Sequence, residues 1–125
     1  MTVKEIGDEL VALCKQGKNF EAIEKLYSSD VVSVEAMAMP DTDQTQTGIE
    51  AIKGKNKWWV ENHEMHGGEV NGQFPHGDRF IVHFKFDVTP KCGGQAGQRM
   101  TMEEMGLYTV KNGKVVKEEF FYSMG

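Results

Sequence analysis

The chain has 125 residues but only two cysteines, Cys14 and Cys92, and their surroundings differ. Cys14 falls within an apolar helical pattern, whereas Cys92 falls in a glycine-rich segment. Two cysteines in such different settings do not form a disulfide framework. We therefore expect Cys14 to pack as a small hydrophobic side chain.

The sequence also lacks long apolar runs and an excess of basic residues. No stretch approaches the roughly 20 apolar residues that cross a membrane, so no membrane span is expected. Lysine and arginine number 14 against 19 aspartates and glutamates, which gives a net charge of −5. Non-specific nucleic-acid binding needs a basic surface, so this balance excludes that class of function. The segment Met1 to Glu5 becomes acidic too early for a signal peptide, and we expect a cytoplasmic protein.

Low-complexity stretches and internal repeats are absent as well. The length suits one domain, which we expect to span residues 1–125. A chain of this size has a sizeable core, because it buries about two thirds of the surface that it exposes when unfolded.

What is present is a change of hydrophobic period along the chain. Apolar residues recur every three or four positions over residues 3–16, after Asn19 and from about 48 to 63, which predicts three helices. A strand over residues 30–36 and an irregular loop over 37–47 separate the second helix from the third. Helices followed by consecutive strands predict an α+β domain with a largely antiparallel sheet. The later strands are predicted over residues 66–74, 80–88, 102–110 and 114–122, with a loop over 91–98.

The last two predicted strands flank a turn at residues 111–113. Asn-Gly within this turn supplies the positive φ that tight hairpins need. Side chains alternate along a strand, so Glu118, Phe120 and Tyr122 share one face. A buried acidic residue between aromatics is costly unless it is paired or used. The hairpin is therefore a candidate pocket wall.

Two registers of this hairpin bring different glutamates to the face of Glu118. A two-residue turn at 112–113 brings Glu103 there. A three-residue loop at 111–113, with glycine in the left-handed position, brings Glu104 there instead.

Three short stretches carry a resemblance to a known family. Residues 20–32 (FEAIEKLYSSDVV) look like its helix running into a strand, residues 48–52 (GIEAI) like its helix start, and residues 108–116 (YTVKNGKVV) like its closing hairpin. With the order of elements, they resemble the SnoaL-like and ketosteroid-isomerase-like branch of the nuclear transport factor 2-like superfamily over nearly the whole chain. Such stretches specify architecture better than chemistry.

The resemblance implies a cone-shaped α+β barrel, in which a strongly curved, mostly antiparallel sheet wraps around the three helices and encloses a pocket. It also implies a homodimer through the outer face of the sheet, where His83, Lys85 and Asp87 would lie. Related hairpins place the position of Tyr108 inside, which favours the three-residue loop, with Tyr108 opposite Val116. The inward row of the strand 80–88 would be Phe80, Val82, Phe84, Phe86 and Val88.

The same resemblance points to Glu35. Aligned on Asp30, Glu35 falls at the position of the general base of ketosteroid-isomerase-like members. An apolar pocket raises the pKa of a carboxyl group, which makes it a better proton acceptor near neutral pH. The alternative is a strand-end glutamate that faces solvent. The positions of the family's oxyanion donors are Leu10 and Gly106 here, so that oxyanion hole is missing and steroid isomerisation is not expected.

The predicted pocket combines carboxyl groups with aromatic and polar side chains. Glu35, Glu104 and Glu118 are the candidate catalytic residues, because carboxyl groups in different environments can serve as acid and base. Tyr108 and Tyr122 are alternatively core residues, each with one satisfied hydroxyl. The candidate ligand contacts are Asn56, Trp59, His63, Phe84, Tyr108, Phe120 and Tyr122.

His63 and His66, with Glu64 between them, have a spacing that suits a metal site on a helix. His63 falls at a helix-to-strand junction, where that spacing loses its meaning, so we predict no metal. We expect His63 to cap the helix terminus and His66 to hydrogen-bond at the pocket rim. The adjacent Trp58 and Trp59 cannot share a face, so one packs inward and the other covers the outer surface.

These features predict a protein that binds an apolar small molecule in the cone. As an enzyme, it would isomerise, dehydrate or cyclise its substrate by proton transfer, without a cofactor. Glu35 would be the base, Glu104 or Glu118 its acidic partner, and Asn56 or Tyr108 would orient the ligand. The alternative is a non-catalytic ligand-binding or dimerisation module in which Glu35 and Glu118 are bonded internally.

Overall fold

The computed structural model describes residues 1–38 and 43–122. Its helices are α1 (Val3–Lys15), α2 (Asn19–Leu26) and α3 (Ile49–Glu61). Its strands are β1 (Tyr27–Val34), β2 (Thr45–Thr47), β3 (His63–His76), β4 (Arg79–Pro90), β5 (Met100–Lys111) and β6 (Lys114–Phe121). Among the described residues, no helix is long and apolar enough to cross a membrane.

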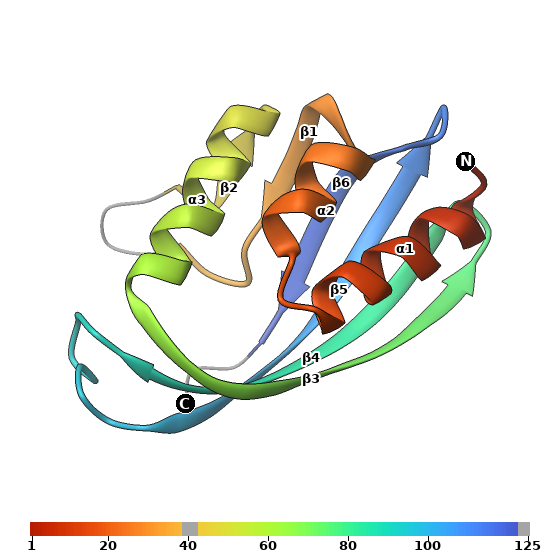
Figure 1. The fold of residues 1–125 in the computed structure, drawn as a ribbon. Coiled ribbons are helices and arrows are strands. Elements are labelled where there is room, and N and C mark those ends of the chain that lie inside the picture. Colours follow the sequence, from red (N-terminus) through yellow and green to blue (C-terminus); the bar gives the residue numbers. More distant parts are fainter. Residues whose placement is uncertain (39–42, 123–125) are drawn as a thin grey trace.

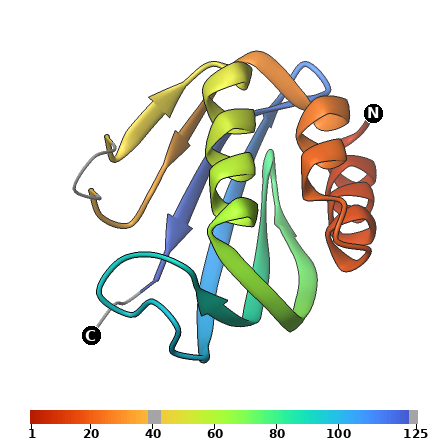
Figure 2. The same cartoon turned by 60° about the vertical axis from the view of Figure 1, so that its left-hand side comes forward.

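The described strands form one sheet in the order β2-β1-β6-β5-β4-β3. Neighbouring strands are antiparallel except for β1 and β6, which run parallel. The three helices lie on the same face of the sheet, and β3 and β4 curve beneath them (Figure 1). Figure 2 shows α3 lying across this concave face, with α1 and α2 beside it. The predicted α+β cone is confirmed.

α1 begins with a capping box, because Thr2 and Glu5 satisfy each other's backbone amides. The Thr2 hydroxyl accepts a hydrogen bond from the Glu5 amide (3.1 Å), and the Glu5 carboxylate accepts one from the Thr2 amide (2.9 Å). Ile6 and Leu10 bury one stripe of the helix in the core. Gly17 follows the helix with a φ of +74°, a conformation that favours glycine, as predicted for its C-terminal cap.

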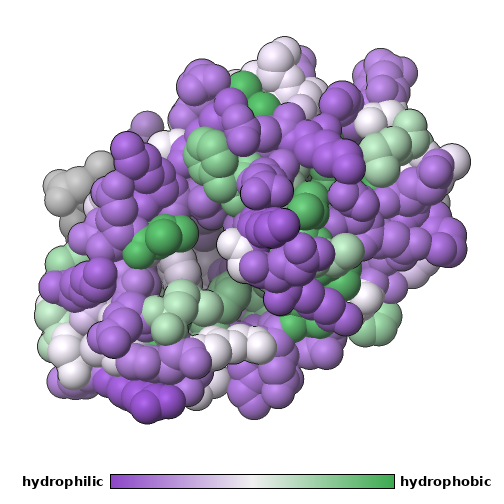
Figure 3. All heavy atoms as spheres, viewed as in Figure 1, coloured by the Kyte–Doolittle hydropathy of each residue, from purple (hydrophilic) through white to green (hydrophobic). Residues whose placement is uncertain are grey.

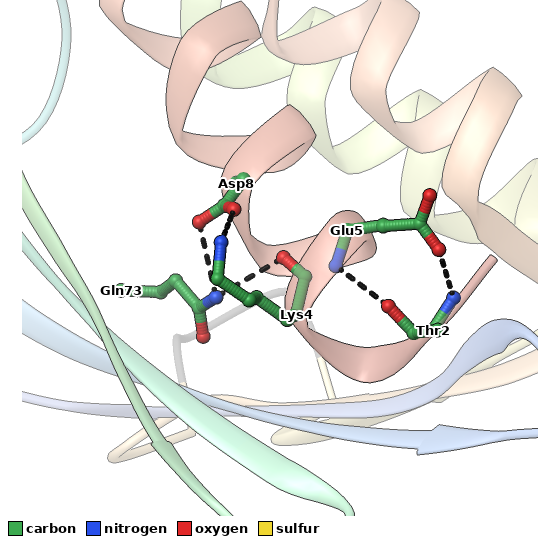
Figure 4. A network of polar contacts seen from close by, with 5 residues as sticks. All are labelled: Thr2, Lys4, Glu5, Asp8 and Gln73. Atoms are coloured by element: carbon green, nitrogen blue, oxygen red, sulfur yellow. Dashed lines mark hydrogen bonds and ion pairs between the residues drawn. The ribbon is translucent and has the colours of Figure 1, made fainter.

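Gln73 fastens α1 to β3 (Figure 4). Its side-chain amide donates hydrogen bonds to the carbonyl of Lys4 and to the carboxylate of Asp8, both at 3.1 Å. Helix and strand meet closely here: a Cβ on Gly7 would lie 2.5 Å from Cδ of Gln73. Glycine at position 7 therefore permits the contact.

The core lies between the helices and the inner row of β4. Phe80, Val82, Phe84 and Val88 are buried on this row, as predicted, and Phe86 is half-buried. The outward side chains of the same strand alternate with them. The burial pattern therefore confirms which side of β4 faces the cone.

Several element boundaries differ from the prediction. β1 covers Tyr27–Val34 rather than residues 30–36, so Glu35 lies one residue beyond the strand. The predicted loop 37–47 contains β2, which pairs with β1 but is too short to produce a hydrophobic period. α3 ends at Glu61, and His63 opens β3. Residues 39–42 of that loop lie outside the described residues.

The hairpin between β5 and β6 closes with a two-residue turn, so the predicted three-residue loop is wrong. Asn112 and Gly113 have φ values of 53° and 73°, and Lys111 pairs with Lys114 across the turn. Positive φ at both central residues is the conformation of a tight hairpin turn. The turn by itself would bring Glu103, not Glu104, to the face of Glu118.

A β-bulge at Val116 brings Glu104 back to the face of Glu118. Val110 pairs with Val115, and the next pair is Thr109 with Lys117, so Val116 is the extra residue. Tyr108 consequently lies opposite Glu118 rather than opposite Val116, which corrects the predicted pair. The bulge has the effect on side-chain direction that we had expected from the loop, and Glu104 shares the inner face with Glu118.

Candidate functional site

Three glutamates and one lysine converge inside the cone. Glu118 comes from β6 and Glu104 from β5, while Glu35 follows the end of β1. Lys55 reaches them from α3, which lies across the concave face (Figure 2). The hydrogen-bonding partners of Glu35 and those of Glu118 divide this cluster into two parts, one at the mouth of the cone and one at its deep end.

At the mouth, Glu35 is held by two donors. The Lys55 ammonium lies 2.6 Å from Oε1 of Glu35, and the Tyr122 hydroxyl donates to Oε2 at 3.0 Å. Lys55 also donates to the hydroxyl of Ser33 (2.6 Å) and lies 5.3 Å from the centre of the Phe120 ring. Because a carboxylate offers about four lone-pair positions, Glu35 can accept further bonds.

At the deep end, Glu118 is only 3% exposed. It accepts a hydrogen bond from the Tyr27 hydroxyl and another from Ser33. Burial raises the pKa of Glu118, and the Lys55 charge and the two hydroxyl donors only partly oppose that rise. Glu118 is thus a carboxyl group fixed inside the protein, and it is not among the residues that line the hollow described below.

Glu104 differs from both. Continuing the β5–β6 register by one pair places it opposite Tyr122, near the mouth. Within residues 1–38 and 43–122, no hydrogen bond to its carboxyl group is found. Burial, and then the charges of Glu35 and Glu118, raise the pKa of Glu104 to about 7, although the charge of Lys55 partly opposes that rise. Near neutral pH this carboxyl group can therefore give or take a proton.

An open hollow of about 370 Å³ lies at the mouth. Figure 3 shows the surface depressed between α3 and the curved strands, whereas the residues that line the 370 Å³ hollow lie around the ends of β1 and β6. A volume of this size suits a small organic molecule. Its walls are Val34, Glu35, Ala36, Gln44, Glu119, Phe120, Phe121 and Tyr122.

Comparison with protein families gives a match over nearly the whole chain, since the SnoaL-like domain model fits residues 1–122. The chain belongs to the SnoaL-like family. A search of curated proteins finds no match.

Solved structures share the fold of this SnoaL-like domain. A protein of Mesorhizobium loti, provisionally named a SnoaL-like polyketide cyclase and a carbohydrate phosphatase, is 50% identical, with a TM-score of 0.90 over 98% of this chain and 100% of its own. A nuclear transport factor 2-like protein of Burkholderia thailandensis is 15% identical, with a TM-score of 0.79 over 98% and 92%. A provisionally named isomerase of Bacillus subtilis is 15% identical, with a TM-score of 0.77 over 98% and 90%. The last two show the fold alone.

The SnoaL-like domain brings only some of the predicted ligand contacts to the hollow. Phe120 and Tyr122 line it. Phe84 and Tyr108 are buried in the core, where Tyr108 stacks on Phe80 with ring centres 5.1 Å apart. Asn56 is half-buried on α3 and is not among the lining residues.

The two tryptophans separate as predicted. Trp58 is 52% exposed, whereas Trp59 turns inward against Phe86. Trp59 also stacks on His63 with ring centres 4.2 Å apart, and Nδ1 of His63 hydrogen-bonds the Trp59 carbonyl at 2.8 Å. His63 therefore caps the last turn of α3, which confirms that prediction. Neither the Trp59 ring nor the His63 ring lines the 370 Å³ hollow.

His66 is exposed and hydrogen-bonds the Thr89 hydroxyl at 2.7 Å. In the part of the chain that the structure describes, no three His, Cys, Asp or Glu side chains group as a metal site. Cys14 packs against the core, and burial raises its thiol pKa to about 12.

Sequence reasoning missed Lys55, Ser33 and Tyr27. Lys55 follows the buried Ile52 by three residues, so it lies on the inward stripe of α3, but a lysine there suggests a solvated side chain. The available signal was the cost of burying carboxyl groups without a cation. Ser33 and Tyr27 lie on β1 at positions that alternate inward, and both are buried.

Proposed function

We propose that this SnoaL-like domain is a cofactor-independent enzyme that moves a proton on an apolar small molecule. The reaction class is isomerisation, dehydration or cyclisation. Glu35 is the base at the hollow, and Glu104 is the acid. The observation that carries the proposal is the pairing of Glu35, held by the Lys55 ammonium group, with a Glu104 whose pKa lies at about 7.

The proton balance is as follows. A C–H bond beside a substrate carbonyl breaks, its proton goes to the Glu35 carboxylate, and its electron pair forms the enolate. Protonated Glu104 donates a hydrogen bond or its proton to the developing oxyanion. Return of the proton to another carbon atom completes an isomerisation, and departure of a β-hydroxyl group, which takes a proton from a protonated glutamate and leaves as water, completes a dehydration. Attack of the enolate carbon on a second carbonyl group of the substrate forms a C–C bond, and protonation of the resulting alkoxide by a protonated glutamate completes a cyclisation.

A second candidate has its own support. Glu35 and Glu118 are both bonded by internal partners, as expected for a non-catalytic ligand-binding or dimerisation module. Glu104 distinguishes the two candidates, because a purely structural role gives no reason to keep a poorly bonded carboxyl group beside two others.

Proton exchange tests the proposal without knowledge of the substrate. Ketones and 1,3-dicarbonyl compounds with apolar substituents are incubated with the protein in deuterated water, and exchange of their α-hydrogens is followed by NMR. We expect catalysed exchange with the wild type and its loss in Glu35→Gln. Exchange in Glu104→Gln should fall by about 100-fold.

The matched control is Glu103→Gln, which makes the same change one residue away on the outer face of β5. It should exchange like the wild type. If no compound exchanges, or if Glu35→Gln retains the wild-type rate, the enzymatic proposal fails. Binding of these compounds without exchange would favour the non-catalytic module.

We also propose a homodimer through the outer sheet face. Ile81, Met105 and Phe121 are exposed there by 38%, 43% and 54%, and Met105 lies opposite Phe121 in the register. His83 and Glu103, joined at 2.6 Å, border them. A two-fold interface would place this apolar patch against itself and remove it from water.

A further inference from the structure

We propose that Lys55 is a catalytic residue, whose ammonium group stabilises the negative charge that develops on the substrate oxygen. The inference rests on the proposed function and adds to it the group that faces the enolate. Removal of a proton by Glu35 sends an electron pair toward the carbonyl oxygen of the substrate. A donor aimed at that oxygen lowers the barrier for this step.

Leu10 and Gly106, the two positions compared above with the family's oxyanion donors, cannot supply such a donor. Leu10 is an apolar core residue, 1% exposed. Gly106 has no side chain, and its space is filled: a Cβ there would lie 2.8 Å from Cε2 of Tyr108 and 3.2 Å from Cε1 of Phe120. Glu104 donates only while it is protonated, and its pKa is about 7.

Lys55 has a donor to spare. An ammonium group carries three N–H bonds. Two of them point to Ser33 and Glu35, both at 2.6 Å, and no third hydrogen-bond acceptor is found among the described residues. The Lys55 side chain is 21% exposed and lines a second opening of about 210 Å³ with Gln46, Ala51 and Trp58, while its ammonium group bonds Glu35, which lines the 370 Å³ hollow. In the proposed arrangement, the remaining donor points toward a ligand beside Glu35.

Its neighbours hold the ammonium group in place before a ligand arrives. Ser33 is fully buried, accepts from Lys55 and donates to Glu118. The ring of Phe120 lies beneath the ammonium group at 5.3 Å, a distance typical of a cation–π contact. Lys55 is the only lysine or arginine of the described residues that bonds a carboxylate in the cone. Such a fixed cation needs little reorganisation during the reaction.

A nitrophenol tests the inference, because its phenolate resembles an enolate oxygen and its ionisation is read from its absorbance. We expect the wild type to bind the phenolate at least tenfold more tightly than the phenol. Lys55→Met should lose this preference, while Lys55→Arg should keep part of it. The control is Lys53→Met on the same helix, since Lys53 pairs with Glu24 and Glu50 near the surface, at 3.7 and 3.6 Å.

Thermal unfolding of each variant confirms that it is folded before it is scored. Absence of a phenolate preference in the wild type, or an unchanged preference in Lys55→Met, overturns the inference. The exchange assay separates this failure from that of the proposed function. Wild-type exchange that survives Lys55→Met would leave the function standing without Lys55. A Lys55-dependent phenolate preference without exchange would leave the anion-stabilising site standing without the reaction.

Discussion

At the residue scale, the three glutamates of the cone differ in the donors that surround them. Glu35 has an ammonium group and a phenol, Glu118 has two hydroxyl groups, and Glu104 has only the electrostatic influence of Lys55. Glu104 is therefore the carboxyl group whose protonation state is fixed least by neighbouring hydrogen-bond donors. Its behaviour decides both the chemistry at the mouth and the pH dependence of stability.

The first prediction concerns that pH dependence. The pKa of Glu104 in the folded chain, about 7, lies above the value of 4.5 for an unperturbed glutamate. The stability that the protonated form contributes is thus fully present below about pH 4.5 and is lost as pH rises through 7. The difference corresponds to about 3 kcal/mol. In urea unfolding, Glu104→Gln should lose part of this decline between about pH 5 and pH 8.

Burial also raises the pKa of Glu118, so some decline should persist in Glu104→Gln. Glu103→Gln serves as the control, and its stability should follow the wild-type pH dependence. An identical decline in Glu104→Gln and the wild type would show that Glu104 does not titrate in this range.

A second residue-scale prediction concerns Gly106. A Cβ at this position would lie 2.8 Å from the Tyr108 ring, so Gly106→Ala should lower the free energy of unfolding by about 1–3 kcal/mol. Gly54→Ala is the opposite case, because it has open space on α3 and should stabilise by about 0.5–1 kcal/mol. Urea unfolding of both variants measures the difference. Equal effects would mean that the Tyr108 and Phe120 rings do not occupy this space.

At the element scale, the side chain of Gln73 links α1 to β3 by hydrogen bonds. Gln73 makes two hydrogen bonds to the first turns of the helix. Gln73→Ala should cost about 1–3 kcal/mol in the free energy of unfolding, because both bonds and their packing are lost. Hydrogen exchange should quicken first in α1. Gln95→Ala, in the exposed loop, should change neither quantity, and an equal change in both variants would contradict the account.

The hairpin shows how far elements can be predicted from the sequence. The period-two alternation determined which side chains of β4 and β6 lie together, and the Asn-Gly pair located the turn. The bulge at Val116 left no such signal, since valine is ordinary in a regular strand. The short β2 likewise left no hydrophobic period in the sequence by which it could be predicted. Sequence reasoning therefore brought Glu35, Glu104 and Glu118 together in the cone, as the structure does, but it missed Lys55, whose inward direction follows from tertiary packing.

At the scale of the whole molecule, one face of the sheet encloses the site and the other carries exposed apolar side chains. The proposed dimer predicts that Met105→Glu weakens association, because it would place charges against each other across the two-fold axis. Analytical ultracentrifugation should find a wild-type dimer and a larger monomer fraction in the variant.

The control is Val60→Glu, which makes a similar change at a 56% exposed position of α3. It should leave the dimer intact. A monomeric wild type at all protein concentrations tested would refute the dimer without affecting the proposed chemistry, since the named catalytic groups belong to one chain.

The central claim is that the cone holds a carboxyl group which exchanges its proton near neutral pH. Carbon-13 NMR titration of the glutamate side-chain carboxyl groups tests it most directly, with the Glu104 signal assigned by its disappearance in Glu104→Gln. We predict a midpoint for Glu104 at about 7. A midpoint near 4.5, the value of an unperturbed glutamate, would contradict the account.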